Sequence, residues 1–385
     1  PESIIMVRQD DGSVKAFYNV CQHRGARLTF NEDGHNDEFA CPYHGWRWDK
    51  SGTLNWAQDP EDFPQGDPCD HLQLQEIRCE EFAGFVWINM DPDCESLKDY
   101  LGPVWDEWQA YEIEGWKRYQ ALTCHMPCNW KVIQDNFNES YHLPAVHPES
   151  DTFVEENYRW TQFDLSDEGH NRMIMRAGMP SHAMMERGEE PMREPLISVL
   201  KMWELNPEDF EGRERECREA LQQAKRELGP KRGYTHYNNL RDEQLSDFYH
   251  YTIFPNFAVS ITSDGFHFLR SVPHPTDPNK CIFDNWFYAS EPEGVETEVM
   301  TPAGPVARGE EVERDVFNYG EQSLGFAIDQ DMGITTGQQL GFRSRGFTGV
   351  YLSHQERRIR RYHEVIDEYI DGKRPMSPQK KMAAE

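Results

Sequence analysis

The sequence lacks an apolar segment long enough to cross a membrane. A spanning helix needs roughly 18 or more consecutive apolar residues, and no run in this chain of 385 residues approaches that length. The first residues, PESIIMVRQDDGS, contain neither the basic region nor the apolar core of a secretion signal. Because a strand pattern already begins at Ser3, we expect that an N-terminal segment precedes this sequence.

Basic residues are scarce compared with acidic ones. The chain has 39 Lys and Arg against 68 Asp and Glu, which gives a formal net charge of −29. A charge of this sign repels nucleic acid and anionic membrane surfaces, so we expect neither as a partner. Together with the absence of a long apolar run, this charge predicts a soluble protein of the cytoplasm whose acids lie mostly on a solvated surface.

Cysteines are few and follow no disulfide pattern. Nine Cys is an odd number spread over a long chain, whereas disulfide scaffolds are short and carry an even number. Reduced thiols and a metal site therefore fit the count better than a disulfide framework. With 37% hydrophobic and 12% aromatic residues, a chain of this length can bury a large core, and two domains are expected.

The first part of the chain is rich in strand-like runs and turn signals. Asp-Gly and Ser-Gly pairs favour turns, and they separate runs that favour strands. We therefore interpret residues 1–112 as a small antiparallel β domain followed by a connector, in which residues 97–111 have the apolar spacing of one helix. The expected strands cover residues 3–8, 16–20, 38–41 and 85–89.

Residues 113–385 combine strand patterns with long helical patterns, which predicts a second domain and an α+β fold overall. Residues 355–370 have an apolar stripe at helical spacing, and helices are expected from Gly309 onward. Residues 177–195 are predicted to form a long loop, and residues 207–229 a charged, solvated helix. The expected strands cover residues 118–125, 172–176, 249–254, 258–262, 266–272 and 282–288.

Two pairs of cysteine and histidine lie within the β domain. Cys21 and His23 are separated by one residue, and after 17 further residues Cys41 and His44 are separated by two. Four such ligands suit zinc or a [2Fe–2S] cluster. Zinc modules usually place both cysteines together, whereas here each loop supplies one residue of each kind. That alternation favours a cluster in which the two cysteines hold one iron and the two histidines hold the other.

The stretch DNFNESYHLPAVH carries two histidines, His142 and His147, behind two carboxylates, Asp135 and Glu139. We expect a helix that bends at Pro144, which would bring both imidazoles to one point. Two imidazoles and one carboxylate are the ligands of a non-haem ferrous oxygenase; a helix end with two ordinary histidines is the alternative. The apolar stripe of the expected helix consists of Trp130, Ile133, Phe137 and Tyr141.

These two motifs together resemble those of the Rieske non-haem iron oxygenases, the family of the large or alpha subunits of aromatic ring-hydroxylating dioxygenases. C-x-H-x17-C-x2-H, with HRG and HGW flanks, resembles the Rieske domain, and DNFNESYHLPAVH resembles the mononuclear-iron motif. The motifs follow the order and spacing of the family, and the resemblance covers essentially the whole chain. It implies a Rieske domain over residues 1–112 and a helix-grip catalytic domain over residues 113–385.

The resemblance also implies roles for particular residues. The family places an Asp near the C-terminus as the third iron ligand, and AIDQDMGITTGQQLG fits with Asp331, or with Asp329 as the second choice. In the family, a carboxylate three residues before the first iron histidine bridges that histidine to a cluster histidine of a neighbouring subunit. That position is Glu139 here, although Asp is the usual residue, so the bridge is direct or through water. Asp135 is implied to be a buried acid near the iron site or at an interface.

The resemblance implies an oxygenase with a [2Fe–2S] cluster and mononuclear Fe(II). Electrons from NAD(P)H would arrive through a reductase, with or without a ferredoxin, and the chain would form a homotrimer or an α3β3 assembly. With O2 it would hydroxylate an apolar or aromatic small molecule, as in aromatic hydrocarbon catabolism. A monooxygenase or demethylase would use the same metals. An electron carrier with an inactive second domain, and a zinc-stabilised binding protein, are alternatives from other classes.

Candidate residues for the substrate pocket come from a methionine-rich stretch and from the strands after residue 248. Aromatic and methionine side chains favour an apolar ligand, and Arg270 is the one candidate to hold a carboxylate. Ordinary core and loop positions are the alternative for the methionines, and half of the aromatics are expected in the core. The candidate lining residues are Met173, Met175, Met179, Met184, Met185, Phe254, Phe257, Phe266, Phe268 and Trp286.

Overall fold

The structure is a computed structural model that describes residues 2–291, 298–309 and 312–374. The chain divides into two compact units, the first ending at Tyr100 and the second running from Leu101 to Lys373. Strands and helices occur in both, as the α+β prediction required. No helix within the described ranges is long and apolar enough to cross a membrane.

The first unit is built from two small antiparallel sheets. One has the strand order β1-β2-β6-β7, and the other has the order β3-β4-β5. Their shared core contains Phe17, Trp48 and Leu54, and it also encloses Cys21 and Cys41. The strands are β1 (Ile4–Arg8), β2 (Val14–Tyr18), β3 (Glu38–Ala40), β4 (Arg47–Asp49), β5 (Leu54–Trp56), β6 (Glu76–Phe82) and β7 (Phe85–Asn89).

The sequence pattern located β1, β3 and β7 but missed the three strands between residues 47 and 82. The strands β4 and β5 have only three residues each, and β6 has the polar sequence EIRCEEF. Such strands lack the apolar runs or clear alternation on which strand prediction depends. Pairing with neighbouring strands supplies the backbone hydrogen bonds that make them strands.

The connector contains two short helices, α1 (Leu97–Leu101) and α2 (Pro103–Gln109), so the single helix expected over residues 97–111 is wrong. Gly102 separates them with a φ of 53°, outside the helical region, and Pro103 then starts the second helix, where its missing N–H costs nothing. Trp108 of α2 meets Tyr251 and Phe266 edge-on within the second unit.

The second unit is organised around one large, mostly antiparallel sheet. Its strand order is β10-β11-β12-β13-β14-β15-β8-β18, with β9 paired to β11, and Ser263 and Asp264 form the expected turn between β13 and β14. The strands are β8 (Lys117–Met126), β9 (Val154–Glu155), β10 (Gln162–Leu165), β11 (Asn171–Ala177), β12 (Phe248–Ile253), β13 (Phe257–Ile261), β14 (Gly265–Pro273), β15 (Cys281–Ala289) and β18 (Asp315–Asn318).

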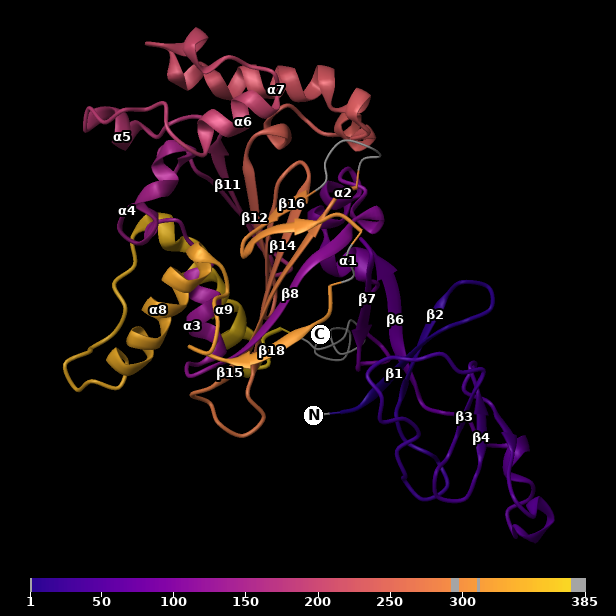
Figure 1. Cartoon of the computed structure of the whole chain (residues 1–385). Coiled ribbons are helices and arrows are strands. Elements are labelled where there is room, and N and C mark those ends of the chain that lie inside the picture. The colour runs from indigo at the N-terminus through magenta and orange to yellow at the C-terminus, as the bar shows by residue number, and fades with distance from the viewer. Residues whose placement is uncertain (1, 292–297, 310–311, 375–385) are drawn as a thin grey trace. The chain divides into compact units, whose positions relative to one another are not determined.

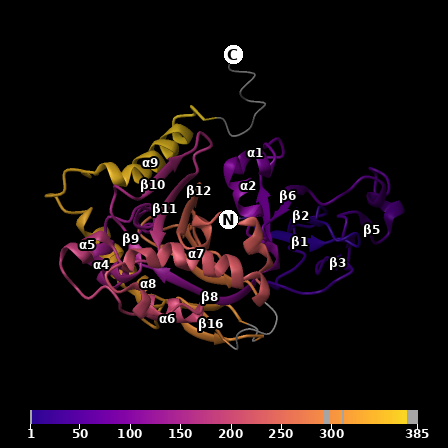
Figure 2. The same ribbon diagram turned by 90° about the horizontal axis from the view of Figure 1, so that it is seen from above.

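Three helices lie together beside this sheet: α3 (Trp130–Asn136), α8 (Phe326–Gly341) and α9 (Arg357–Ile370) (Figure 1). Figure 2 shows α9 next to β10 and β11. The helices do not begin at Gly309 as expected, because β18 (Asp315–Asn318) pairs in parallel with β8 before α8 starts. A two-stranded ribbon of β16 (Glu298–Thr301) and β17 (Gly304–Ala307) also precedes the helices.

The segment between β11 and β12 also differs from the prediction. The expected loop over residues 177–195 contains α5 (His182–Glu186) and is followed by α6 (Leu196–Met202). The expected helix over residues 207–229 reduces to α7 (Cys217–Leu228), which buries Cys217 and Leu221 and so is not simply solvated. Because many residues of α7 are charged, the sequence pattern did not reveal this buried face.

The two faces of the large sheet bury different partners. On one face, Leu269 and Phe283 share a buried cluster with Phe137 at the end of α3 and Met332 of α8. Because side chains alternate along a strand, Phe266 and Phe268 point to the opposite face, where Phe266 meets Trp108. The face covered by α3 and α8 therefore positions the histidines and acids considered next.

Candidate metal centres

The segment Asp135–His147 is not one bent helix. Helix α3 ends at Asn136, and a separate short helix, α4 (Leu143–Val146), begins after His142. Pro144 lies at the start of α4, where proline is tolerated, so the expected bend at Pro144 is wrong and the break comes earlier. Since Tyr141 lies outside α3 and its side chain is 58% exposed, it does not belong to the expected apolar stripe.

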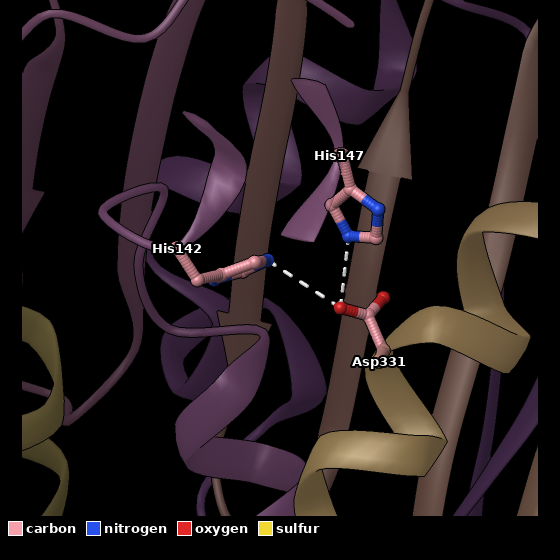
Figure 3. Close-up of side chains that lie close together, drawn as sticks. All are labelled: His142, His147 and Asp331. Carbon is pink, nitrogen blue, oxygen red and sulfur yellow. Dashed lines mark hydrogen bonds and ion pairs between the residues drawn. The ribbon is translucent and has the colours of Figure 1, made fainter. Parts of the chain in front are cut away.

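The break nevertheless brings the two histidines together with a remote acid. His142 and His147 flank α4, and Asp331 projects from α8 toward both, in front of the sheet (Figure 3). The Asp331 Oδ1 atom lies 2.9 Å from His147 Nε2 and 3.4 Å from His142 Nε2. Their ligand atoms all lie within 4.8 Å of one another. Two imidazole nitrogens and a carboxylate at one point fit a ferrous ion with positions left open.

A second hydrogen bond orients each histidine ring. His142 Nδ1 lies 2.6 Å from Glu139 Oε1, and the His142 backbone N–H donates to the other Glu139 oxygen at 3.0 Å. His147 Nδ1 lies 2.7 Å from Gln330 Oε1. Each Nδ1 therefore carries a proton, so a metal that displaces the proton on Nε2 meets a lone pair directed toward the common point.

The charges at this point favour an ionised acid and protonated imidazoles when no metal competes. Burial opposes ionisation of Asp331, but hydrogen bonds with His142 and His147 outweigh it and lower the Asp331 pKa to about 2. Burial likewise opposes protonation of His142, yet Asp331 and Glu139 raise its pKa to about 10. The pKa of His147 is also raised, chiefly by Asp331 against burial. A cation at this point would replace those protons.

The other two acids of the sequence analysis have separate partners. Asp329 accepts hydrogen bonds from the Leu324 backbone N–H, at 2.8 Å, and from the Ser323 hydroxyl, so it secures the start of α8. Asp135 accepts from His363 Nε2 at 2.9 and 3.0 Å, which ties α3 to α9. Of the two candidates for the third ligand, only Asp331 lies beside the histidines.

The four Cys and His side chains of the first unit come from two similar loops. The Gly25 N–H donates to Cys21 O at 3.0 Å, and the Gly45 N–H donates to Cys41 O at 2.9 Å. Both glycines have positive φ, 77° and 71°, which a side chain would strain. Each loop thus turns tightly between its cysteine and its glycine, with the histidine inside the turn.

The two histidines among these side chains have ring nitrogens that no other group in the described structure satisfies. His23 Nδ1 and His44 Nδ1 are buried without a hydrogen-bond partner in the described structure, and the two rings lie 4.6 Å apart. Burial, and then His44, lower the pKa of His23, so its imidazole is neutral at pH 7. Burial and the neighbouring Cys41 thiol raise the pKa of Cys21. Unpaired ring nitrogens beside two buried thiols fit the donor set of a [2Fe–2S] cluster.

The pairing of one cysteine with one histidine in each loop differs from the usual zinc module, in which both cysteines come together. Each loop here supplies one residue of each kind, Cys21 with His23 and Cys41 with His44. That alternation suits a cluster in which the two cysteines hold one iron and the two histidines hold the other.

Several residues around the iron triad were not found from the sequence. Gln330 orients His147, and Arg358 is fully buried next to Asn171, Thr252 and His250. The position of Gln330 directly before Asp331 was a usable signal, since metal-bound histidines generally donate their second N–H to an acceptor. No local pattern distinguishes Arg358, because it follows the helical spacing of α9 like its exposed neighbours.

The aromatic lining residues expected from the sequence lie away from the triad. The sheet face that packs on α2 carries four of them: Phe257, Phe266, Phe268 and Trp286. Phe257 and Phe266 meet Trp108 edge-on, and Phe268 stacks on Trp286 and lies tilted against Phe257. Phe254 stacks on Tyr369 of α9. Sheet alternation thus turns the rings of Phe266, Phe268 and Trp286 to the face opposite the triad.

The other pocket candidates have structural partners. Arg270 is paired with the buried Asp284 at 2.6 Å, so its charge is not open to a carboxylated substrate. Met173 and Met175 belong to a buried cluster with Val154. Met179 and Met184 are buried, whereas Met185 is exposed.

Sequence comparison agrees with this assembly of an iron–sulfur domain and a mononuclear-iron domain in one chain. Residues 113–372 match the family described as ring hydroxylating alpha subunit (catalytic domain), and residues 1–73 match the Rieske [2Fe-2S] domain. The chain belongs to the ring hydroxylating alpha subunit family of Rieske oxygenases. The family cofactors are accordingly the Rieske cluster and a mononuclear iron, as the sequence resemblance implied.

Curated relatives include enzymes with different substrates. The carnitine monooxygenase oxygenase subunit of Escherichia coli (strain K12) is 38% identical over 161 residues, 41% of this chain and 43% of that protein. A glycine betaine monooxygenase oxygenase subunit of Chromohalobacter salexigens is 34% identical over 148 residues, 38% of this chain and 32% of that protein. The large component of naphthalene 1,2-dioxygenase from Pseudomonas aeruginosa is 33% identical over 160 residues, covering 39% and 34%. The matches span less than half the length of each relative.

Solved structures share the fold over almost the whole chain. The quaternary ammonium Rieske monooxygenase CntA with gamma-butyrobetaine superposes with a TM-score of 0.61 at 19% identity, covering 96% of this chain and 81% of that one. Naphthalene 1,2-dioxygenase with indole bound gives a TM-score of 0.56 at 19% identity, with the same coverage. At this identity, the likeness establishes the fold.

Proposed function

We propose that this protein is the terminal oxygenase component of a Rieske system that hydroxylates a small molecule with O2. The observation that carries the proposal is a complete His142, His147 and Asp331 triad in the same chain as two Cys/His loops suited to a [2Fe–2S] cluster. Electrons would come from NAD(P)H through a reductase, directly or through a ferredoxin. The absence of membrane-spanning helices in the described residues is consistent with the cytoplasmic location that we propose.

In this proposal, iron held by the triad supplies the activation of O2, and the chain's residues control the site around it. Glu139 and Gln330 hold the two imidazole rings so that each Nε2 faces the metal. Asp331, with its low pKa, provides a negative charge at every physiological pH. The side chain of Asp331 is buried, while His142 remains partly exposed; a substrate would approach from that side.

Electron transfer between the centres is proposed to run between subunits. The carboxylate of Glu139 already accepts a hydrogen bond from His142, and it would also meet His23 or His44 of a neighbouring chain. This route requires a trimer, either of this chain alone or with a smaller second subunit. Light scattering of the purified, active protein tests it, because an active monomer would contradict the proposal.

For the reaction type, we favour monooxygenation, including oxidative demethylation, over aromatic dihydroxylation. Two of the relatives named above are monooxygenase subunits for carnitine and glycine betaine, and the aromatic side chains expected to line a pocket lie on the other face of the sheet. Dihydroxylation of an aromatic ring is the second candidate, favoured by the naphthalene dioxygenase relative.

The proposal is tested by supplying the iron-loaded protein with NADH, a surrogate reductase and 18O2. Carnitine, glycine betaine and naphthalene serve as probes, and mass spectrometry counts the labelled oxygen atoms in each product. Products with one labelled atom support monooxygenation, and two atoms in naphthalene support dihydroxylation. Asp331→Ala is the matched control, since it should abolish product while its cluster is still reduced.

The alternatives predict different results in the same experiment. An electron carrier with an inactive second domain would be reduced and reoxidised without product on any probe. A zinc-stabilised binding protein would show no visible absorption from a cluster and would contain zinc by elemental analysis. The complete triad disfavours the first alternative, and the alternation of cysteine and histidine in the two loops disfavours the second.

A further inference from the structure

Three polar side chains form a row across the sheet beside the iron triad. His250 of β12 is in register with Ser260 of β13, which is in register with His267 of β14. None of the three belongs to the metal ligand sets or to the aromatic residues expected from the sequence. Polar groups inside a protein normally have hydrogen-bond partners, so the partners of these three side chains indicate what the row can bind.

The row lies on the face of the sheet that carries the triad. Ala258 and Leu269 pack in the buried cluster with Phe137 and Met332, and Ser260 and His267 are each two residues away from them on the same strands, hence on the same face. Thr252, two residues from His250, donates to Asn138 at 2.7 Å, in the segment just before His142. The charges of His142 and Asp331 also influence the pKa of His250, although burial is the main effect and lowers it.

Arg358 determines which hydrogen-bonding atom His250 offers. Its Nη2 lies 3.3 Å from His250 Nδ1, and burial lowers the Arg358 pKa only to about 9, so the guanidinium is charged at neutral pH. A guanidinium can only donate, so His250 Nδ1 is the acceptor. Because burial keeps this imidazole neutral, its proton is on Nε2, on the side of the ring away from Arg358.

A chain of hydrogen bonds makes the free ring nitrogen of His267 an acceptor, whereas that of His250 is a donor. The Ala303 backbone N–H donates to Gln120 Oε1 at 2.9 Å, so the Gln120 amide nitrogen donates to Asn285 Oδ1 at 3.0 Å. Asn285 Nδ2 in turn donates to the Leu324 carbonyl at 2.6 Å. Asn285 Oδ1 must then accept from His267 Nε2, 2.7 Å away. Burial lowers the His267 pKa to about 4, so its free Nδ1 is an acceptor.

The row thus presents a donor, a hydroxyl and an acceptor. His250 Nε2–H, Ser260 Oγ and His267 Nδ1 have no hydrogen-bond partner within residues 2–291, 298–309 and 312–374, and these atoms are not sealed from solvent. Both rings are neutral, so the row has no charge with which to bind a carboxylate or an ammonium group. It is complementary to a neutral group that both accepts and donates a hydrogen bond.

We propose that His250, Ser260 and His267 are substrate-positioning residues that bind a hydroxyl group of the substrate beside the iron triad. The inference rests on the oxygenase function proposed above and narrows its substrate class to a hydroxylated small molecule. A hydroxyl would donate to His267 Nδ1 and accept from one of the donors of the row, the Ser260 hydroxyl on the adjacent strand or His250 Nε2–H. A hydrocarbon at the same place would leave these groups unpaired, and sites built to bond a hydroxyl discriminate strongly against analogues that lack it.

The test measures binding, so it is independent of turnover. The probes are 4-fluorobenzyl alcohol, which donates and accepts, its methyl ether, which only accepts, and 4-fluorotoluene, which does neither. Anaerobic ferrous protein broadens the 19F signal of a probe held near the triad, and the same measurement on Asp331→Ala gives the background without that iron. We expect the alcohol to bind at least about tenfold more tightly than the ether or the toluene.

Variants of His267 link this preference to the row. His267→Phe should reduce the alcohol preference to less than about twofold, whereas His267→Asn, which keeps an acceptor near the Nδ1 position, should retain part of it. His354→Phe makes the same change at an exposed histidine and should leave the preference intact. Iron content and thermal unfolding of each variant verify that it is folded and loaded.

Three results would overturn the assignment. They are equal binding of the three probes by the unaltered protein, an alcohol preference that survives in His267→Phe, and no iron-dependent broadening by any probe. Failure of the oxygenase function is seen separately, as absence of product and of NADH-dependent O2 consumption with a reductase. An oxygenase that turns over other compounds but shows no preference for the alcohol would contradict this inference and leave the proposed function intact.

Discussion

Glu139 Oε1 lies 2.6 Å from His142 Nδ1, and this contact directs the opposite nitrogen of the ring to within 3.4 Å of Asp331. The carboxylate also accepts from the His142 backbone N–H, so it fixes both the ring and the turn that carries it. We therefore propose that Glu139 supports the iron site without being one of its three ligands. The family resemblance implies Asp at this position, and the longer Glu side chain found here bonds the ring without an intervening water.

Glu139→Gln should separate electron transfer from metal binding. Glutamine keeps the size of the side chain and an oxygen that accepts from His142 Nδ1, but it removes the charge. We expect both metal centres to stay loaded, the cluster to be reduced normally by its donor, and product formation to fall by about 10–100-fold or more. Loss of iron would instead identify Glu139 as a ligand, and near-normal turnover would make it an ordinary surface acid.

Gln330 is expected to contribute to iron affinity through His147. Gln330→Ala removes the acceptor that lies 2.7 Å from His147 Nδ1, so the ring can turn away from the metal. Losses of this kind typically weaken metal binding by about 10–100-fold, which a competition titration with a ferrous chelator measures. Gln338→Ala, an exposed glutamine of the same helix, should bind iron normally.

Asp331→Ala and Asp329→Ala form a matched pair for the identity of the third ligand. Asp331→Ala should lose the mononuclear iron while the visible spectrum of the cluster is unchanged, because the two sites lie in different units. Asp329→Ala should keep the iron and lose about 1 kcal/mol of stability, since it removes the acceptor for Leu324 and Ser323. The reverse pattern of iron loss would show that the wrong acid was assigned.

The histidine ligation of the cluster predicts the effect of His44→Cys. A thiolate adds negative charge where a neutral imidazole stood, so the reduction potential should fall by on the order of 100 mV or more. Spectroelectrochemical titration measures the shift, and iron analysis verifies that a cluster is still assembled. An unchanged potential, or zinc in place of iron in the unaltered protein, would exclude His44 as a cluster ligand.

Iron binding at the triad should strengthen as the pH rises. Burial opposes the protonation of His142, but Asp331 and Glu139 outweigh it and raise its pKa to about 10, so iron must displace a proton throughout the neutral range. The apparent association constant should therefore increase at least about tenfold per pH unit between pH 6 and pH 8, and more steeply where His147 must also lose a proton. A histidine with an ordinary pKa would instead give a plateau above about pH 7. Titration with ferrous ion in Glu139→Gln should show a weaker dependence.

The sequence by itself determined the kind of fold and predicted the two proposed ligand sets. Cys21, His23, Cys41 and His44 lie in short loops, where spacing alone limits what the side chains can bind. His142 and His147 are likewise close in the chain, and strands β13 to β15 have apolar runs long enough to be found from their pattern. Such local features can be recognised in the sequence without any knowledge of long-range contacts.

Tertiary structure alone decided the surroundings of the iron site. The end of α3 at Asn136 and the face of the sheet to which each side chain points depend on packing, because a shift of one residue in a strand reverses every side chain. Sequence reasoning therefore placed Phe266 and Phe268 near the iron, although pairing with β13 and β15 turns them toward Trp108. Arg358 and His267 acquire their roles only through partners more than a hundred residues away or on neighbouring strands. Those partners decide whether a ring nitrogen of His250 or His267 donates or accepts, and they cannot be identified from the neighbouring sequence.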